Sequence, residues 1–297
     1  PSDNQLTQAR IDLGRKLFYD TRLSRDNSIS CGTCHKQELA FADERVIAQG
    51  LANRLGLRHT PTLANIGYTD IMFADGGVIT LELQSQSPIF EHTEFDYTIA
   101  EFIERIADDN EYQRMFQDAY GQEPAAFGIS RAIAAFERTF ISGNSRFDQY
   151  EYNGDENALS NSEKRGRDLF FSSELECVAC HQPPLFTNFE FENIGLYETY
   201  ADTGRERITQ LFEDNGKFKV PTLRNIALTA PYMHNGSIAT LQEVIEHFNS
   251  GGVYHPNKSE KIRPLNLSEQ EKADLVDFLE SLTDQQIINN PDLAEPN

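Results

Sequence analysis

The chain has 297 residues, 39% of them hydrophobic and 25% charged, which is enough for two compact domains of roughly 100–150 residues each. Its formal net charge of -21 argues against nucleic acid as a partner, because phosphate binding needs patches of Lys and Arg. No apolar run approaches the ~20 residues that cross a bilayer. The first residues also lack the basic and apolar regions of a signal peptide.

The predicted secondary structure is mainly helical, with long loops and little sheet. Near the N-terminus, a helix with an aromatic face leads toward Cys31. Apolar residues then recur at helical spacing within 99–106 and 129–140. The segment 149–163 that follows is polar and poor in helix-forming patterns. We therefore expect the domain junction there, between a domain 1–155 and a domain 156–297.

Two helix starts in the second half carry the same signal. Ser160 is followed three residues later by Glu163, and Ser268 by Glu271. In this Ser-x-x-Glu capping box each side chain binds a backbone N–H group at the first turn of a helix. The pattern predicts one helix that begins after Ser160 and another that begins after Ser268.

The four cysteines fall into two Cys-x-x-Cys pairs, and a histidine directly follows each pair. The motifs are CGTCH at 31–35 and CVACH at 177–181. This is the attachment signature of haem c, in which two thiols add to the vinyl groups of one porphyrin and the imidazole binds its iron. The predicted haem-binding residues are Cys31, Cys34, His35, Cys177, Cys180 and His181, with His35 and His181 as proximal iron ligands.

A zinc site or disulfides are the alternatives. A zinc site made of both pairs would require Cys34 and Cys177 to converge from distant parts of the chain, and neither alternative explains the trailing histidines. Haem c is attached outside the cytoplasm, so the motifs predict an exported protein in the periplasm or at the cell surface. The signal peptide absent from this sequence is then explained by a mature form or by removal of the leader.

The two halves of the chain resemble each other. GRKLFY before the first motif matches GRDLFF before the second. Farther on, PTLANIGYTDIMFADGGVITL (61–81) aligns without gaps on PTLRNIALTAPYMHNGSIATL (221–241), with 9 identities in 21 positions. This is a tandem duplication, in which each unit has one haem motif and one Pro-Thr-Leu segment.

These features resemble the bacterial dihaem cytochrome c peroxidase and MauG superfamily. The likeness covers nearly the whole chain and includes FADGG in the first half and LTAPYMHNGS in the second. FSSELECVACH and HPNKSEKIRPLNLSEQEKADLVDFLESLTD further resemble the MauG-like branch linked to copper-responsive and methanobactin-associated proteins. The resemblance implies two tandem cytochrome c-like domains, each with a covalent haem c, the first haem reacting with peroxide and the second transferring electrons.

Two catalytic residues follow from the resemblance. The family's distal Gln and Glu fall on Gln84 and Glu94. A carboxylate over the iron can take a proton from peroxide and return it to the leaving oxygen, while the amide holds the oxygens in place. Many of the peroxidases also cap this iron with a His from the following loop, but no His lies between Lys36 and Arg58. The resemblance then implies a five-coordinate first iron, as in MauG.

The sequence departs from the family pattern at the calcium site and at the position between the haems. His59 replaces an Asn that helps to bind calcium, and imidazole is a poor ligand for this ion. The carbonyls of Thr229 and Pro231 are the remaining calcium candidates. Ala74 stands where the family has a Trp between the haems, and this chain has no Trp. Phe73, Tyr68 or a short gap between the haems are the alternative electron routes.

The sixth ligand of the second haem stays open. The family's Met or Tyr falls on Phe248, which cannot bind iron. His247 from the same helix, or Met233 or His255 from a loop, could serve instead. In a further alternative the iron is five-coordinate and Phe248 packs over it.

Three functions are compatible with these residues. The favoured one uses hydrogen peroxide to form high-valent haem iron and oxidises a partner protein, as MauG does at tryptophan. The second is a cytochrome c peroxidase that takes electrons from a small cytochrome c or cupredoxin. The third is a plain electron carrier. The missing distal His and the missing Met at position 248 favour the first over the second, and Gln84 with Glu94 argues against the third.

Overall fold

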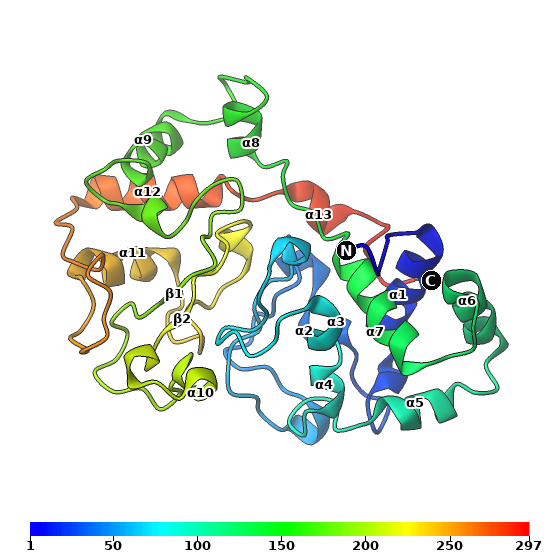
Figure 1. The fold of residues 1–297 in the computed structure, drawn as a ribbon. Coiled ribbons are helices and arrows are strands. Elements are labelled where there is room, and N and C mark those ends of the chain that lie inside the picture. The colour runs from blue at the N-terminus through cyan, green and yellow to red at the C-terminus, as the bar shows by residue number, and fades with distance from the viewer. Residues whose placement is uncertain (297) are drawn as a thin grey trace. The chain divides into compact units, whose positions relative to one another are not determined.

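The computed structural model describes residues 1–296, and these are mainly helical as predicted (Figure 1). They form two compact units. The first comprises Pro1–Asp70, Val78–Ile141 and 287–296, and the second comprises Ile71–Gly77 and Ser142–Gln286. The first unit thus gives way to the second at Ile141, before the polar segment at which the sequence places the junction. None of the helices within residues 1–296 combines the length and hydrophobicity needed to cross a membrane.

The helices of the first unit surround an aromatic core. They are α1 (Gln8–Tyr19), α2 (Cys31–Cys34), α3 (Leu81–Gln84), α4 (Ser87–Phe90), α5 (Ile99–Arg105), α6 (Asn110–Tyr120) and α7 (Ala126–Glu137), with 3-10 turns at Thr21–Leu23, Gln37–Leu39, Leu51–Asn53 and Ile66–Tyr68. α1 packs against α7 (Figure 1). Phe18 of α1 meets Phe136 of α7 edge to face at 5.5 Å, and Phe41 stacks on Phe140 at 3.7 Å. All four rings are fully buried.

The second unit repeats this arrangement. Its elements are α8 (Arg146–Glu151), α9 (Asn161–Phe170), β1 (Phe191–Glu192), α10 (Glu206–Thr209), β2 (Phe218–Lys219), α11 (Leu241–Ser250) and α12 (Glu269–Glu280), with 3-10 turns at Cys177–Ala179, Phe212–Asp214 and Ile226–Leu228. α13 (Gln285–Asn289) begins in this unit and ends in the first. α9 packs against α12, with Phe170 and Phe278 5.1 Å apart. β1 and β2 form a short antiparallel sheet.

The predicted capping boxes are confirmed. Ser160 and Glu163 bind each other's backbone N–H groups at the start of α9, and Ser268 and Glu271 do the same at the start of α12. These polar caps satisfy N–H groups that the first turn of a helix leaves unpaired.

The duplication predicted from sequence is visible in the backbone of the Pro-Thr-Leu segments. The Thr62 hydroxyl donates to the Ala40 carbonyl at 2.5 Å, and the Thr222 hydroxyl donates to the Leu185 carbonyl at 2.6 Å. Asn65 and Asn225 both adopt a left-handed conformation, with φ near +59°. Each Pro-Thr-Leu segment is therefore fixed to the loop that follows its own Cys-x-x-Cys-His motif.

One segment of the first half belongs to the second unit. This strap, Ile71–Gly77, contains the FADGG sequence. The Lys219 backbone N–H donates to the Ala74 carbonyl at 2.8 Å, and the Lys219 ammonium donates to the Ile71 carbonyl at 2.7 Å. The fully buried Asp75 carboxylate pairs with Arg207 at 2.6 Å. Polar contacts from the second unit thus hold a piece of the first repeat.

Candidate functional site

The first Cys-x-x-Cys-His motif forms one helical turn. Ser30 and Thr33 cap α2 reciprocally, and the His35 backbone N–H donates to the Cys31 carbonyl at 2.9 Å. The His35 Nδ1–H donates to the Phe41 carbonyl at 2.8 Å, because a carbonyl can only accept. The ring is thereby held with its lone pair on Nε2, the nitrogen left to bind a metal.

The second motif has the same local geometry. The His181 backbone N–H donates to the Cys177 carbonyl at 2.9 Å, and the His181 Nδ1–H donates to the Phe186 carbonyl at 3.0 Å. Burial lowers the pKa of both His35 and His181, which keeps each imidazole neutral. A neutral ring with a fixed tautomer is what an axial iron ligand requires.

These residues fit one haem c in each unit. Each motif places two thiols and one oriented imidazole within five residues, and all four cysteines are free of disulfide bonds. Burial raises the pKa of Cys34 and of Cys177 to about 11. A zinc site needs four such ligands in one place, and within residues 1–296 no three His, Cys, Asp or Glu side chains are grouped to hold a metal ion. A bound haem would supply an iron able to react with peroxide or to carry electrons.

Glu94 lies close to the first motif. It belongs to the tight turn after α4, and its negative charge raises the pKa of both Cys31 and Cys34. Burial, helped by the neighbouring Glu91, raises the pKa of Glu94 itself to about 7. A carboxyl group with this pKa can both accept and donate a proton near neutral pH.

Gln84 is the last residue of α3, in the same unit. Its Oε1 atom is buried and has no hydrogen-bond partner. A buried acceptor of this kind is costly unless water or a ligand satisfies it, which is a frequent property of functional sites.

The loop after the first haem motif binds the turn that carries Glu94. The Leu51 N–H donates to the Glu94 carbonyl at 2.8 Å. Gly50 lies so close to this turn that a Cβ on it would be 2.0 Å from the Thr93 carbonyl oxygen. Arg54 then pairs with Asp96 at 3.0 Å, at the end of the turn. This loop therefore fixes the backbone around Glu94.

The second unit contains the candidate sixth ligands. The His247 Nε2–H donates to the Ile194 carbonyl at 3.1 Å, so this nitrogen is already engaged. Both ring nitrogens of His255 are also occupied, by Asn193 and Asn215. Met233 has a left-handed backbone, with φ of +74°. Of the three side chains, the two histidines are therefore tied to other protein groups.

The residues considered for calcium do not form a side-chain cage. Thr229 ends the 3-10 turn Ile226–Leu228, two residues before Pro231, and its hydroxyl donates to the Ile226 carbonyl at 3.2 Å. The His59 Nδ1–H donates to the Arg45 carbonyl at 3.0 Å. Residues 1–296 hold no group of three or more His, Cys, Asp or Glu side chains arranged for a metal ion.

The sequence did not reveal the strap contacts around Ala74. The Arg205 guanidinium donates to the Asp75 and Gly76 carbonyls at 2.9 and 3.0 Å and lies over the Phe191 ring at 4.5 Å. Phe73, an alternative electron carrier, has a φ of +63°, whereas Tyr68 is 58% exposed. The only hint in the sequence is the acid Asp75 within FADGG, and its partner Arg207 lies far along the chain.

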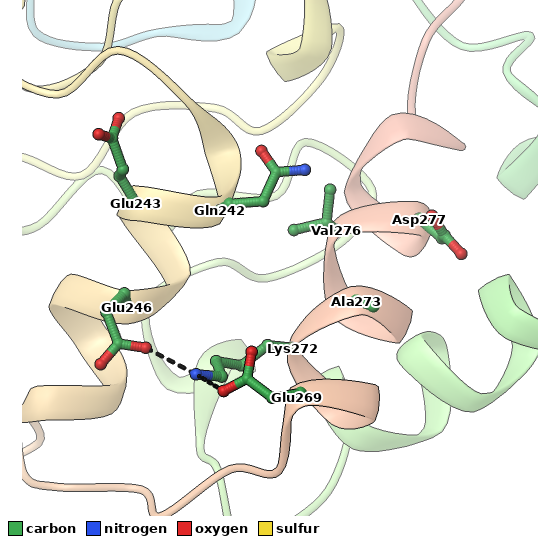
Figure 2. A pocket seen from close by; sticks show the side chains of 8 residues that line it. All are labelled: Gln242, Glu243, Glu246, Glu269, Lys272, Ala273, Val276 and Asp277. Atoms are coloured by element: carbon green, nitrogen blue, oxygen red, sulfur yellow. Dashed lines mark hydrogen bonds and ion pairs between the residues drawn. The ribbon is translucent and has the colours of Figure 1, made fainter.

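A pocket of about 420 Å³ opens between α11 and α12 (Figure 2). Its lining includes Glu243, Glu246, Glu269 and Asp277, and the single cation Lys272 pairs with Glu246 at 2.9 Å. None of the residues predicted for the site lines this pocket.

Comparison with known proteins places the chain in a family. The model for "Di-haem cytochrome c peroxidase" matches residues 8–157. MauG of Methylorubrum extorquens is 36% identical over 286 residues, which are 95% of this chain and 80% of that protein. The cytochrome-c peroxidase IdrP1 of Denitromonas iodatirespirans is 34% identical, over 99% of this chain and 87% of that protein.

Solved structures agree with this assignment. The crystal structure of a MauG-like protein associated with microbial copper homeostasis is similar with a TM-score of 0.95 and 36% identity, over 100% of this chain and 95% of that one. The relatives are named as peroxidases and MauG proteins, which are peroxidase-type oxidoreductases. This chain therefore belongs to the di-haem cytochrome c peroxidase and MauG family.

Proposed function

We propose that this dihaem oxidoreductase uses hydrogen peroxide at its first haem to oxidise a partner protein, in the manner of MauG. The loop after the first haem motif carries the proposal. It contains no histidine between Lys36 and Arg58 that could cap the iron, and its Leu51 N–H holds the Glu94 turn instead. The first site would then accept peroxide without prior reduction.

The protein groups act on peroxide as follows. Glu94 takes a proton from one peroxide oxygen and returns it to the oxygen that leaves, for which its pKa of about 7 is suitable. Gln84 orients the oxygens through its side-chain amide. His35 and His181 would each bind one haem iron, and a backbone carbonyl fixes the orientation of each ring. The haems, attached at Cys31, Cys34, Cys177 and Cys180, supply the redox chemistry.

Location and partners follow from this proposal. Covalent haem c attachment takes place outside the cytoplasm, so we propose a periplasmic or cell-surface protein. Its proposed reactants are hydrogen peroxide and a partner protein. Calcium is not needed for the steps assigned here.

A cytochrome c peroxidase is the second candidate, because several relatives carry that name. The two functions differ in what happens to a small electron donor. Peroxide is added to the diferric protein, and the haem spectra are followed with and without reduced cytochrome c. A long-lived spectral change that cytochrome c does not reverse is the expected result. Rapid oxidation of cytochrome c over many turnovers would overturn the protein-oxidase proposal in favour of the peroxidase.

A further inference from the structure

The first unit contains all the unsatisfied buried polar groups found in residues 1–296. Each buried side-chain N or O atom without a hydrogen-bond partner belongs to this unit, and the second unit has none. The residues that carry these atoms are Asn4, His59, Gln84, Tyr120, Arg131 and Glu137. Since most buried polar groups in proteins are satisfied, such a concentration indicates internal water or a functional role.

Glu137 is the acidic member of this group. It is the last residue of α7, it is only 4% exposed, and its Oε2 atom has no partner. An unpaired carboxylate in such a place loses the hydration it would have in water. Burial, helped by the nearby Glu82, raises the pKa of Glu137 to about 8, against the opposing charge of Arg138. The group therefore holds a proton at neutral pH.

The second unit has a leucine at the equivalent position. Gly14 of α1 approaches Ala132 and Phe136 of α7, and Gly166 of α9 approaches Asp274 and Phe278 of α12 in the same way. This correspondence pairs Glu137 with Leu279, which is 5% exposed in the core of its own unit. The fold thus accepts an apolar side chain here, so packing alone does not require the acid.

Glu137 lies near the first haem motif. Its charge raises the pKa of Cys31, as that of Glu94 does. The charged and titratable groups that act on it or that it acts on are Arg138 of its own helix, Glu82 of α3 and Cys31 of α2. Two carboxyl groups, Glu94 and Glu137, therefore lie close enough to the first motif for their charges to act on Cys31.

A chain of polar contacts leads from Glu82, whose charge acts on Glu137, to Asp3 at the surface. Glu82 pairs with Arg138 at 2.7 Å and accepts a hydrogen bond from the Asn4 side-chain amide at 2.8 Å. Asn4 also donates to the Arg131 carbonyl at 3.0 Å. The Arg131 guanidinium pairs at 2.7 Å with Asp3, whose side chain is 64% exposed. Unsatisfied atoms on Asn4, Arg131 and Glu137 are suited to hold water along this chain.

We propose that Glu137 and this polar chain supply protons to the first haem site. The inference rests on the proposed peroxide function. Each hydrogen peroxide takes two electrons from the partner protein and two protons from solvent; the O–O bond breaks, two O–H bonds form, and two waters result. Glu137 releases a proton toward the peroxide oxygens and regains one from solvent through water beside Asn4, Glu82 and Arg138.

The test compares Glu137→Gln with Glu137→Asp. The amide keeps the size of the acid but cannot release the proton, whereas the aspartate can. Haem absorbance is followed by stopped flow after peroxide is added, in H2O and in D2O. We expect Glu137→Gln to react about tenfold more slowly, with a larger solvent isotope effect, and Glu137→Asp to retain most of the rate. Glu111→Gln, which removes a surface partner of Lys16, is the matched control and should behave as wild type.

A second measurement does not depend on turnover. Infrared spectra of the resting protein at neutral pH should contain a protonated carboxylic acid band that shifts in D2O and is missing in Glu137→Gln. A purely structural role predicts equal losses in the Gln and Asp variants and an unchanged isotope effect, which would overturn the inference. If the wild type reacts with peroxide and Glu137→Gln reacts equally fast, the role of Glu137 is overturned while the proposed function stands. A wild-type protein that does not respond to peroxide would instead overturn the proposed function.

Discussion

Gly14 of α1 lies directly against the Ala132 carbonyl of α7, so closely that a Cβ at Gly14 would be 1.9 Å from the carbonyl oxygen. Gly166 and Asp274 repeat this contact in the second unit, with a corresponding distance of 1.8 Å. The obstructing atoms are backbone, which cannot move aside as a flexible side chain could. In each unit a glycine therefore permits the central helix crossing.

We expect Gly14→Ala and Gly166→Ala each to reduce the free energy of unfolding by about 3 kcal/mol, because the helices must separate to admit a methyl group. Urea unfolding followed by circular dichroism measures this loss. Gly143→Ala is the control, since a Cβ there meets no atom within 4 Å, and its effect should stay within about 0.5 kcal/mol. Equal stability of all three variants would show that the crossing is not as tight as described.

Covalent attachment is tested by mass. The intact protein from a host that attaches haem c should exceed the polypeptide mass by two haems after denaturation. The double variant Cys31→Ser and Cys34→Ser should carry one haem, because only the motif at 177–181 remains. The corresponding change at Cys177 and Cys180 is the matched variant. A mass equal to the bare polypeptide, with zinc recovered by elemental analysis, would contradict the haem assignment.

The sequence was most informative where the interactions are local. The helix starts after Ser160 and Ser268 are determined by pairs of residues three positions apart, and the structure has both capping boxes. The placement of the strap could not be predicted, because the Asp75 partner Arg207 is remote in sequence and only the tertiary fold brings them together. The burial of Glu137 could not be predicted for a related reason. An acid beside a helical apolar pattern is ordinarily expected to face solvent, and only the structure shows that this one does not.

Glu94 gives a prediction for pH dependence. If its carboxylate accepts the peroxide proton, the reaction should slow as the pH falls below about 7, where Glu94 becomes protonated. Glu94→Gln should be slower by about a hundredfold or more at pH 8 and should lose this pH dependence. Stopped-flow rates of wild type and variant, measured at steps from about pH 5 to about pH 9, test both the slower rate and the lost pH dependence. A variant with the rate and pH profile of the wild type would remove Glu94 from the reaction.

The same group affects stability. Its pKa is higher in the folded protein than the ordinary value of 4.5, so the folded state binds more protons than the unfolded state between these values. The contribution of Glu94 to stability is therefore fully present below pH 4.5. It is lost as the pH rises from there to about 7. Glu94→Gln should remove a pH-dependent loss of up to about 3 kcal/mol. Urea midpoints that differ from wild type equally at pH 5 and at pH 8 would contradict this.

His247 tests the coordination of the second haem. Its Nε2–H is bound to the Ile194 carbonyl, so we expect His247→Ala to leave the haem spectrum unchanged. The variant should lose about 1 kcal/mol of stability, because the carbonyl loses its donor. Met233→Leu is the companion variant, since its thioether is the remaining side-chain ligand among those considered for this iron. Conversion of the second haem to a high-spin spectrum in His247→Ala would put the imidazole on the iron and would require α11 to move away from Ile194.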